Sequence, residues 1–200
     1  MQLGTPTDKT VQGDYTGDGK ADIAFWRPST GFWNVLRSED SSYYAFPFGT
    51  DGDVPVPGDY DGDGKSDAAV FRPSTVTWFI SRSGDGGTTI QQFGAAGDQP
   101  VTADYDGDGK ADIAIFRPNG SSGAGEWWVR RSSDASVFAL QFGTSTDKTV
   151  QGDYTGDGKA DAGVFRQPGA QWFVNRSAGG TLIQSFGIAG DIPLPSVYVR

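Results

Sequence analysis

The chain has 200 residues, a formal net charge of −9, and neither cysteine nor histidine. The missing cysteines exclude disulfides and thiolate chemistry, and the missing histidines remove the usual zinc and copper ligand and the side chain that titrates near neutrality. The acidic surplus argues against nucleic acid as a partner, because nucleic-acid binding depends on clustered Lys and Arg. No apolar run approaches the roughly 20 residues of a membrane-spanning helix, and no charged-then-apolar leader follows Met1.

The composition predicts a turn-rich all-β protein. Its 30 Gly, 11 Pro and 13% aromatic residues are the residue types that punctuate and fill short strands. An Asp-Tyr pair recurs every 45 to 49 residues, at Asp14, Asp59, Asp104 and Asp153. A period of this size is typical of solenoids, propellers or arrays. Leucine-rich and β-helix solenoids need a shorter repeat, and helical repeats need apolar residues at helical spacing, so neither pattern fits.

Each repeat is predicted to hold four short strands. In the second repeat these strands cover residues 54–57, 67–72, 78–82 and 89–93, and each is bounded by Gly, Pro, Ser or Asp. Four such strands make one propeller blade. We therefore predict an all-β fold class, a β-propeller built of four-stranded antiparallel blades, with four repeats per chain. Residues 119–125, rich in Gly and Ser, lengthen one hairpin loop of the third repeat.

The repeat also sets the expected boundaries within a single repeat domain, 1–200. Residues 1–12 are expected to end a preceding blade, and the repeats cover 13–57, 58–102, 103–151 and 152–195. A fifth copy of the pattern begins near the C-terminus but lacks the Asp residues of the acidic motif. Residues 196–200 are therefore predicted to form a closing strand.

An acidic loop follows the first predicted strand of every repeat. In the second repeat it places Asp59, Asp61, Asp63 and Asp67 at loop positions 1, 3, 5 and 9, with Gly64 at position 6. The sharp turn of an EF-hand loop also requires Gly at position 6, and position 7 there offers its backbone carbonyl. Carboxylate oxygens in this number favour calcium, because magnesium keeps its waters and softer metals prefer nitrogen or sulfur.

We number these acidic loops 1 to 4 and predict about one calcium ion (Ca2+) in each, four in total. Asp and Gly are also common turn formers, but turn preference would accept Asn or Ser and does not explain four copies of one acidic spacing. Position 3 is Thr in loops 1 and 4, so these two loops are predicted to bind calcium more weakly. The predicted ligands, each Lys acting through its backbone carbonyl, are Asp14, Thr16, Asp18, Lys20, Asp22, Asp59, Asp61, Asp63, Lys65, Asp67, Asp104, Asp106, Asp108, Lys110, Asp112, Asp153, Thr155, Asp157, Lys159 and Asp161.

The acidic loops, together with a Phe-Gly pair in each repeat, resemble FG-GAP or VCBS repeats, which build integrin α-subunit propellers and occur in many secreted bacterial proteins. The resemblance covers nearly the whole chain. It implies a propeller with calcium bound in the loop between the first two strands of each blade, and an extracellular or cell-surface location. The Phe-Gly pairs are Phe48-Gly49, Phe93-Gly94, Phe142-Gly143 and Phe186-Gly187.

Two further series recur once per repeat. The Trp series could form a sugar-binding platform, but a residue present in every repeat more often anchors the core between blades. The Arg series is predicted to pair with a recurrent Asp or to stack on aromatic rings rather than to line a ligand groove. The Trp series is Trp33, Trp78, Trp127 and Trp172. The Arg series is Arg27, Arg72, Arg117 and Arg166, and the Asp series is Asp8, Asp53, Asp98, Asp147 and Asp191.

Catalysis is not predicted, because the metal assignment already uses nearly every clustered carboxylate. Glycoside hydrolysis needs two carboxylates at a set separation, and isolated residues such as Glu39 and Glu126 have nothing in the sequence to orient them. The leading hypothesis is a non-catalytic calcium-binding β-propeller module for extracellular recognition or adhesion, with a protein or glycan ligand. Two alternatives stay open: a carbohydrate-binding lectin with inter-blade sugar pockets, and a ligand-free structural module of a larger secreted protein.

The two ends of the chain predict how the array closes. Residues 9–15 and 193–199 are both first-strand segments, and only one can be innermost in a given blade. The C-terminal segment is expected either to complete a compact four-bladed monomer or to cross to a second chain. Either arrangement removes exposed sheet edges. The second is favoured because most bacterial and integrin relatives that the resemblance implies have more than four blades, so a homodimer or higher assembly is predicted.

Overall fold

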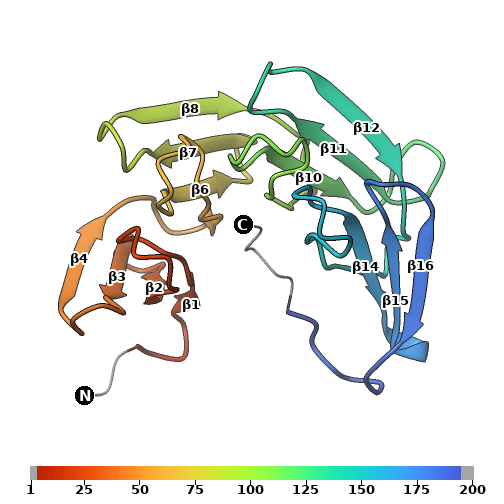
Figure 1. Ribbon diagram of the computed structural model, residues 1–200, viewed down its shortest axis with the longest axis horizontal. Coiled ribbons are helices and arrows are strands. Elements are labelled where there is room, and N and C mark those ends of the chain that lie inside the picture. The colour runs from red at the N-terminus through yellow and green to blue at the C-terminus, as the bar shows by residue number, and fades with distance from the viewer. Residues whose placement is uncertain (1–3, 195–200) are drawn as a thin grey trace. The chain divides into compact units, whose positions relative to one another are not determined.

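The computed structural model describes residues 4–194, and the predicted closing strand, 196–200, lies outside them. The chain divides after Ala96 into two compact units. Each unit holds two four-stranded antiparallel sheets in which the strands follow one another in chain order (Figure 1). These four sheets are propeller blades, and the predicted all-β fold class is confirmed. Among the described residues, no helix is long and apolar enough to cross a membrane.

The first unit contains blades 1 and 2. Each begins with a two-residue strand that pairs with the first of three five-residue strands. Blade 1 consists of β1 (Lys9–Thr10), β2 (Ile23–Arg27), β3 (Phe32–Leu36) and β4 (Tyr43–Pro47). Blade 2 consists of β5 (Val54–Pro55), β6 (Ala68–Arg72), β7 (Thr77–Ser81) and β8 (Thr88–Gln92). The strands of blade 2 lie within the segments predicted from the sequence, or within one residue of them.

The second unit repeats this plan in blades 3 and 4. Blade 3 consists of β9 (Gln99–Pro100), β10 (Ile113–Arg117), β11 (Glu126–Arg130) and β12 (Val137–Gln141). Blade 4 consists of β13 (Lys148–Thr149), β14 (Ala162–Arg166), β15 (Gln171–Asn175) and β16 (Thr181–Ser185). A short 3-10 turn, η1 (Gln167–Gly169), joins β14 to β15.

An apolar cluster joins the two blades of each unit. In the first unit Trp26, Trp33 and Val35 of blade 1 pack in one cluster with Ala68 and Val70 of blade 2. The second unit has the corresponding cluster between blades 3 and 4. We call the sheet face that a blade turns toward the next blade its trailing face, and the opposite face its leading face. Burial of apolar side chains between these faces is the main source of stability in each unit.

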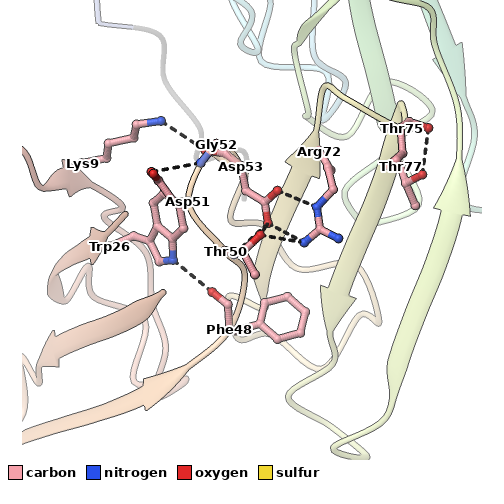
Figure 2. Close-up of polar contacts among 10 residues, drawn as sticks. All are labelled: Lys9, Trp26, Phe48, Thr50, Asp51, Gly52, Asp53, Arg72, Thr75 and Thr77. Carbon is pink, nitrogen blue, oxygen red and sulfur yellow. Dashed lines mark hydrogen bonds and ion pairs between the residues drawn. The ribbon is translucent and has the colours of Figure 1, made fainter. Parts of the chain in front are cut away.

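The Phe-Gly pair forms the step from one blade to the next. The carbonyl oxygen of Phe48 accepts hydrogen bonds from the indole Nε1 atoms of Trp26 and Trp33, both at 3.0 Å, and Figure 2 shows the first of these. Gly49 has φ of +90°, and a Cβ atom there would lie 2.9 Å from Val70 of blade 2. A larger residue would be strained and would push the blades apart, which explains the Gly of the motif.

The recurrent Arg and Asp pair within each blade, as predicted. The Arg72 guanidinium donates to both carboxylate oxygens of Asp53, at 2.8 and 2.9 Å (Figure 2), and its centre lies 4.4 Å from the Phe79 ring centroid. The Arg27 hydrogen bond lowers the pKa of Asp8 to about 2. The last Asp of the series, Asp191, instead accepts the Ile188 N–H at 2.9 Å. The four pairs are Arg27 with Asp8, Arg72 with Asp53, Arg117 with Asp98, and Arg166 with Asp147.

Candidate metal centres

Each acidic loop connects the two-residue strand of a blade to the strand beside it. In loop 2, the N–H of Asp67 donates to the Gly58 carbonyl at 2.8 Å, and this antiparallel bridge closes the loop at its base. Gly62 and Gly64 have φ of +82° and +84°, a conformation that favours glycine. The bridge and the two glycines fold the loop into a tight ring around its own side chains. The same bridge closes loops 1, 3 and 4.

Position 1 is an Asp whose carboxylate lies inside this ring. In loop 2 the carboxylate of Asp59 accepts the N–H of Gly62 at 2.6 Å and the N–H of Gly64 at 2.8 Å. Such Asx-type turns explain why Asp is followed by Gly at fixed spacing. The same two bonds form in loops 1, 3 and 4. Position 1 therefore organises the loop through its own hydrogen bonds.

Position 9 is the most buried carboxylate of each loop. Asp67 and Asp112 are 0% exposed. One oxygen of Asp67 accepts the Tyr60 N–H at 2.8 Å, and the other accepts the Ser83 N–H at 2.7 Å from the turn between β7 and β8. The same two kinds of bond are present in the other three loops. Position 9 thus joins the acidic loop to a turn elsewhere in its blade.

A serine that follows the third strand holds two loop carboxylates at once. Besides its N–H bond to position 9, Ser83 donates its hydroxyl to Asp63 at position 5, at 2.9 Å. The sequence analysis missed these serines, although each follows an Arg at the end of its third strand and could have been recognised by that repeat. The four serines are Ser38, Ser83, Ser132 and Ser177.

Position 3 separates the loops into two kinds. In loops 2 and 3 it is an Asp that reaches the turn after the third strand, where Asp61 accepts the Gly84 N–H at 2.9 Å and Asp106 accepts the Ser133 hydroxyl at 2.5 Å. In loop 4 the Thr155 hydroxyl instead points back to the carboxylate of position 1, at 3.3 Å. The Thr of loop 1 makes the same contact at 3.4 Å.

Three carboxylates converge in loops 2 and 3. In loop 2, oxygens of Asp59, Asp61 and Asp67 lie within 4.8 Å of one another, and loop 3 brings three oxygens together equally closely from positions 1, 3 and 5. Within residues 4–194, loops 1 and 4 form no such group of three. Hard oxygen donors at this density fit a calcium ion, which takes six to eight oxygen ligands.

The electrostatics of the loops agree with this division. Burial raises the pKa of Asp112 to about 6. Burial also raises the pKa of Asp104 at position 1 of loop 3, and the charges of its neighbouring carboxylates add to the effect. At position 1 of loop 4, burial acts to raise the pKa of Asp153, but the backbone N–H groups around it outweigh burial and the pKa is lowered. Loop 3 thus concentrates negative charge that a cation would relieve.

Neighbouring acidic loops in each unit are bonded to each other. The N–H of Ser66, at position 8 of loop 2, donates to the carbonyl of Asp14 in loop 1 at 2.6 Å. Ala160 of loop 4 donates in the same way to the carbonyl of Asp104 in loop 3, also at 2.6 Å. At position 7 the Lys65 N–H donates to Asp63 at 2.9 Å. The ligand role of the Lys carbonyls stays a prediction.

Three of the four residues of the Trp series are buried within the blades. Trp33, Trp78 and Trp127 are 0% exposed. Each donates its indole N–H to the carbonyl of the Phe in its Phe-Gly pair, and so does the half-buried Trp172. A buried ring offers no face to a sugar, so for these three residues the structure favours the core-anchor interpretation.

The isolated carboxylates are held by their own neighbours. The Ser121 hydroxyl and N–H and the Trp128 indole all donate to Glu126, and these bonds lower its pKa to about 2. Glu126 thereby ties down the lengthened hairpin loop of blade 3. A carboxylate whose pKa is this low stays ionised near neutral pH and is a poor general acid. Glu39 lies 3.7 Å from Arg37.

Comparisons with known proteins agree with the repeat pattern and with the fold. Residues 59–115, which include acidic loops 2 and 3, match the family model described as an FG-GAP-like repeat. That match confirms the predicted resemblance to this repeat. No curated protein matches the chain.

Solved structures of similar fold have low sequence identity to this chain. A lectin from Agrocybe aegerita, titled for its recognition of non-reducing terminal N-acetylglucosamine, is 19% identical, with 92% of this chain and 53% of that chain covered and a TM-score of 0.61. A streptogramin B lyase is 11% identical, with 92% and 57% covered and a TM-score of 0.59. A catalytically inactive virginiamycin B lyase from Staphylococcus aureus is 10% identical, with 98% and 74% covered and a TM-score of 0.52.

These likenesses show the shared fold alone. The chain spans just over half the length of the lectin and of the streptogramin B lyase.

Proposed function

Since this chain carries an FG-GAP-like repeat, we propose that it is a calcium-binding β-propeller module, with the ion held in the loop between the first two strands of a blade. The observation that carries the proposal is the convergence of three carboxylates within 4.8 Å in loop 2 and again in loop 3. Two further loops share the spacing but have Thr at position 3. Loops 2 and 3 are therefore the stronger sites.

The side chains at positions 1, 3, 5 and 9 and the Lys carbonyl at position 7 would hold the ion. A bound calcium ion supplies positive charge and fixes the direction of several oxygen ligands at once. The chain's own bonds prepare the loop for that role. The serine after the third strand holds positions 5 and 9, and the N–H groups of the loop glycines hold position 1.

We further propose that the module acts outside the cell in recognition or adhesion and has no catalytic activity. Extracellular calcium modules work with weak sites, with Kd of about 0.1 to 1 mM, and loops of three or four carboxylates suit that range. The carboxylates of loops 2 and 3 are committed to the proposed ion, and Glu126 is locked as an anion by its neighbours. The ligand class proposed is a protein or a glycan.

Titration calorimetry with calcium tests the metal proposal. The wild-type chain is expected to bind calcium, with magnesium as the competing control, and Asp61→Asn together with Asp106→Asn should remove most of the heat. The proposal would be overturned if the wild-type chain gave no more heat with calcium than the double variant does. A glycan array and a pull-down with extracellular proteins, each run with calcium and with chelator, then identify the ligand class, and a glycan signal would favour the lectin alternative.

A further inference from the structure

The trailing face of blade 4 is apolar and exposed. Tyr154 and Phe186 on this face are 40% and 74% exposed. At the same repeat positions in blade 3, Tyr105 is 8% exposed and Phe142 packs against the core cluster of the second unit. Blade 4 therefore presents the surface that blade 3 buries. Large exposed apolar surfaces of this kind mark interaction sites.

The packing inside each unit shows what covers a trailing face. Blade 2 packs Ala68 and Val70, 4% and 0% exposed, into the cluster of blade 1. Blade 4 packs Ala162 and Val164, 3% and 0% exposed, into the cluster of blade 3. In both units the trailing face is covered by the leading face of another blade of the same repeat. A matching leading face is accordingly the occupant expected for the trailing face of blade 4.

Blade 1 carries an exposed leading face of this kind. Ile23 is 68% exposed there, whereas Ala68 and Ala162, at the same position of blades 2 and 4, are buried. Phe25 lies two residues further along β2 and is half-buried, with the Arg27 guanidinium centre 5.3 Å from its ring centroid. Among residues 4–194, blade 1 thus has an exposed leading face and blade 4 has an exposed trailing face.

We propose that a second copy of this chain docks head to tail, with the leading face of its blade 1 on the trailing face of blade 4. The contact is heterologous, because two different faces meet, and it buries Ile23 and Phe186 at the junction.

The first-strand position of the docked blade is already occupied by its own N-terminal segment. Val11, which follows β1, is 2% exposed, and Asp8 holds Arg27 at 2.8 Å. Leu194 holds the corresponding repeat position after blade 4 and is 84% exposed. The docked copy therefore keeps β1, and the junction forms without exchange of the C-terminal segment.

Light scattering on the 200-residue chain in calcium tests the docking. The expected mass is at least twice 21.2 kDa. Ile23→Asp and Phe186→Asp should each yield the monomer, because every junction then has one damaged face. In an equimolar mixture, the intact leading face of Phe186→Asp can dock on the intact trailing face of Ile23→Asp, so a dimer should form. Ile90→Asp is the matched control, since Ile90 is 65% exposed on β8, and it should keep the wild-type mass.

Three results would overturn the proposal: a wild-type mass of 21.2 kDa, an assembly that persists in Ile23→Asp, or loss of the assembly on deletion of residues 193–200. Persistence in Ile23→Asp would mean that identical faces pair. Loss on deletion would mean strand exchange in place of face docking. Because both substitutions lie at exposed positions, circular dichroism melting curves should match the wild type and thereby exclude unfolding as the cause.

Discussion

Acidic loops 3 and 4 lie in neighbouring blades of one unit and differ at a single loop position. Residues 104–112 read DYDGDGKAD, and residues 153–161 read DYTGDGKAD. In loop 3 the Asp at position 3 extends to the opposite turn and adds a third carboxylate to the cluster. In loop 4 the Thr turns inward and donates to position 1.

This difference shows that one repeat can be stable in two ways. In the Thr loop the backbone N–H groups around position 1 lower the pKa of the half-buried Asp153, although burial opposes this. In the Asp loop burial and the neighbouring carboxylates raise the pKa of Asp104 at the same position, and burial raises the pKa of Asp112 at position 9 to about 6. Under the proposed calcium function, the Asp loop should gain more stability from an ion than the Thr loop. The following predictions test that contrast, from the largest expected effect to the smallest.

Loss of the position 9 carboxylate should have the largest effect. Without calcium, Asp112→Ala and Asp161→Ala should each lower the free energy of unfolding by about 3 kcal/mol, because each leaves two backbone N–H groups without an acceptor. With calcium, Asp112→Ala should cost more than Asp161→Ala, since only loop 3 also loses a strong site. Denaturant titrations in calcium and in chelator measure both values. Equal losses in calcium would contradict the division of the loops.

Calcium itself should stabilise each filled loop by about 2.7 kcal/mol at a hundredfold excess over Kd. Asp106→Thr gives loop 3 the sequence of loop 4 and should remove this gain from the second unit. Thermal melting curves with calcium and with chelator provide the measurement. Asp134→Thr removes an exposed carboxylate outside the loops and serves as control, with the calcium effect intact. An unchanged calcium shift in Asp106→Thr would contradict the role of position 3.

The reverse substitution should strengthen a weak loop. Thr155→Asp is expected to tighten calcium binding at loop 4 at least tenfold, which is about 1.4 kcal/mol. Thr16→Asp should gain less, because Glu39 in blade 1 stands where blade 4 has Ala178 and would repel the new carboxylate. Calorimetry on the two variants compares the gains. Equal gains would show that position 3 is not influenced by the residue after the serine that holds positions 5 and 9.

The pH dependence should be the smallest effect. The folded protein binds the proton of Asp112 more tightly than the unfolded chain does, because its pKa is raised from 3.8 to about 6. Between these values the folded state holds more protons, so the free energy of unfolding falls as the pH rises. In chelator, going from about pH 7.5 to about pH 5.5 should therefore add about 0.8 kcal/mol.

Melting curves across this pH range test the sign. Asp112→Asn has no carboxylate to titrate at position 9, so its calcium-free curve should lose this rise at lower pH. In calcium the trend should reverse, because protons compete with the ion for the same oxygens. A calcium-free chain that becomes less stable toward pH 5.5 would contradict the burial of a charged Asp112.

The sequence predicted the blades, the acidic spacing and the Arg-Asp pairs because all of these repeat along the chain. It also predicted weaker loops at Thr16 and Thr155, and within the described residues the clusters of three carboxylates form only in the other two loops. The serine that holds positions 5 and 9 was missed, because its role depends on a turn that folding brings back to the loop. The exposed faces of blades 1 and 4 were missed as well, since exposure depends on which neighbour is present. The closing strand, 196–200, stays a prediction.

The backbone bond between neighbouring loops should make calcium binding cooperative within a unit. Asp104 carries two functions, since its carboxylate faces loop 3 and its carbonyl accepts the Ala160 N–H of loop 4 at 2.6 Å. An ion that fixes Asp104 also fixes that carbonyl, so loop 4 loses less conformational entropy when it orders its own ligands. By linkage, an ion in loop 4 should raise the affinity of loop 3 by the same factor. If calcium binds as proposed, the Thr loop would therefore bind more tightly once its neighbour is filled.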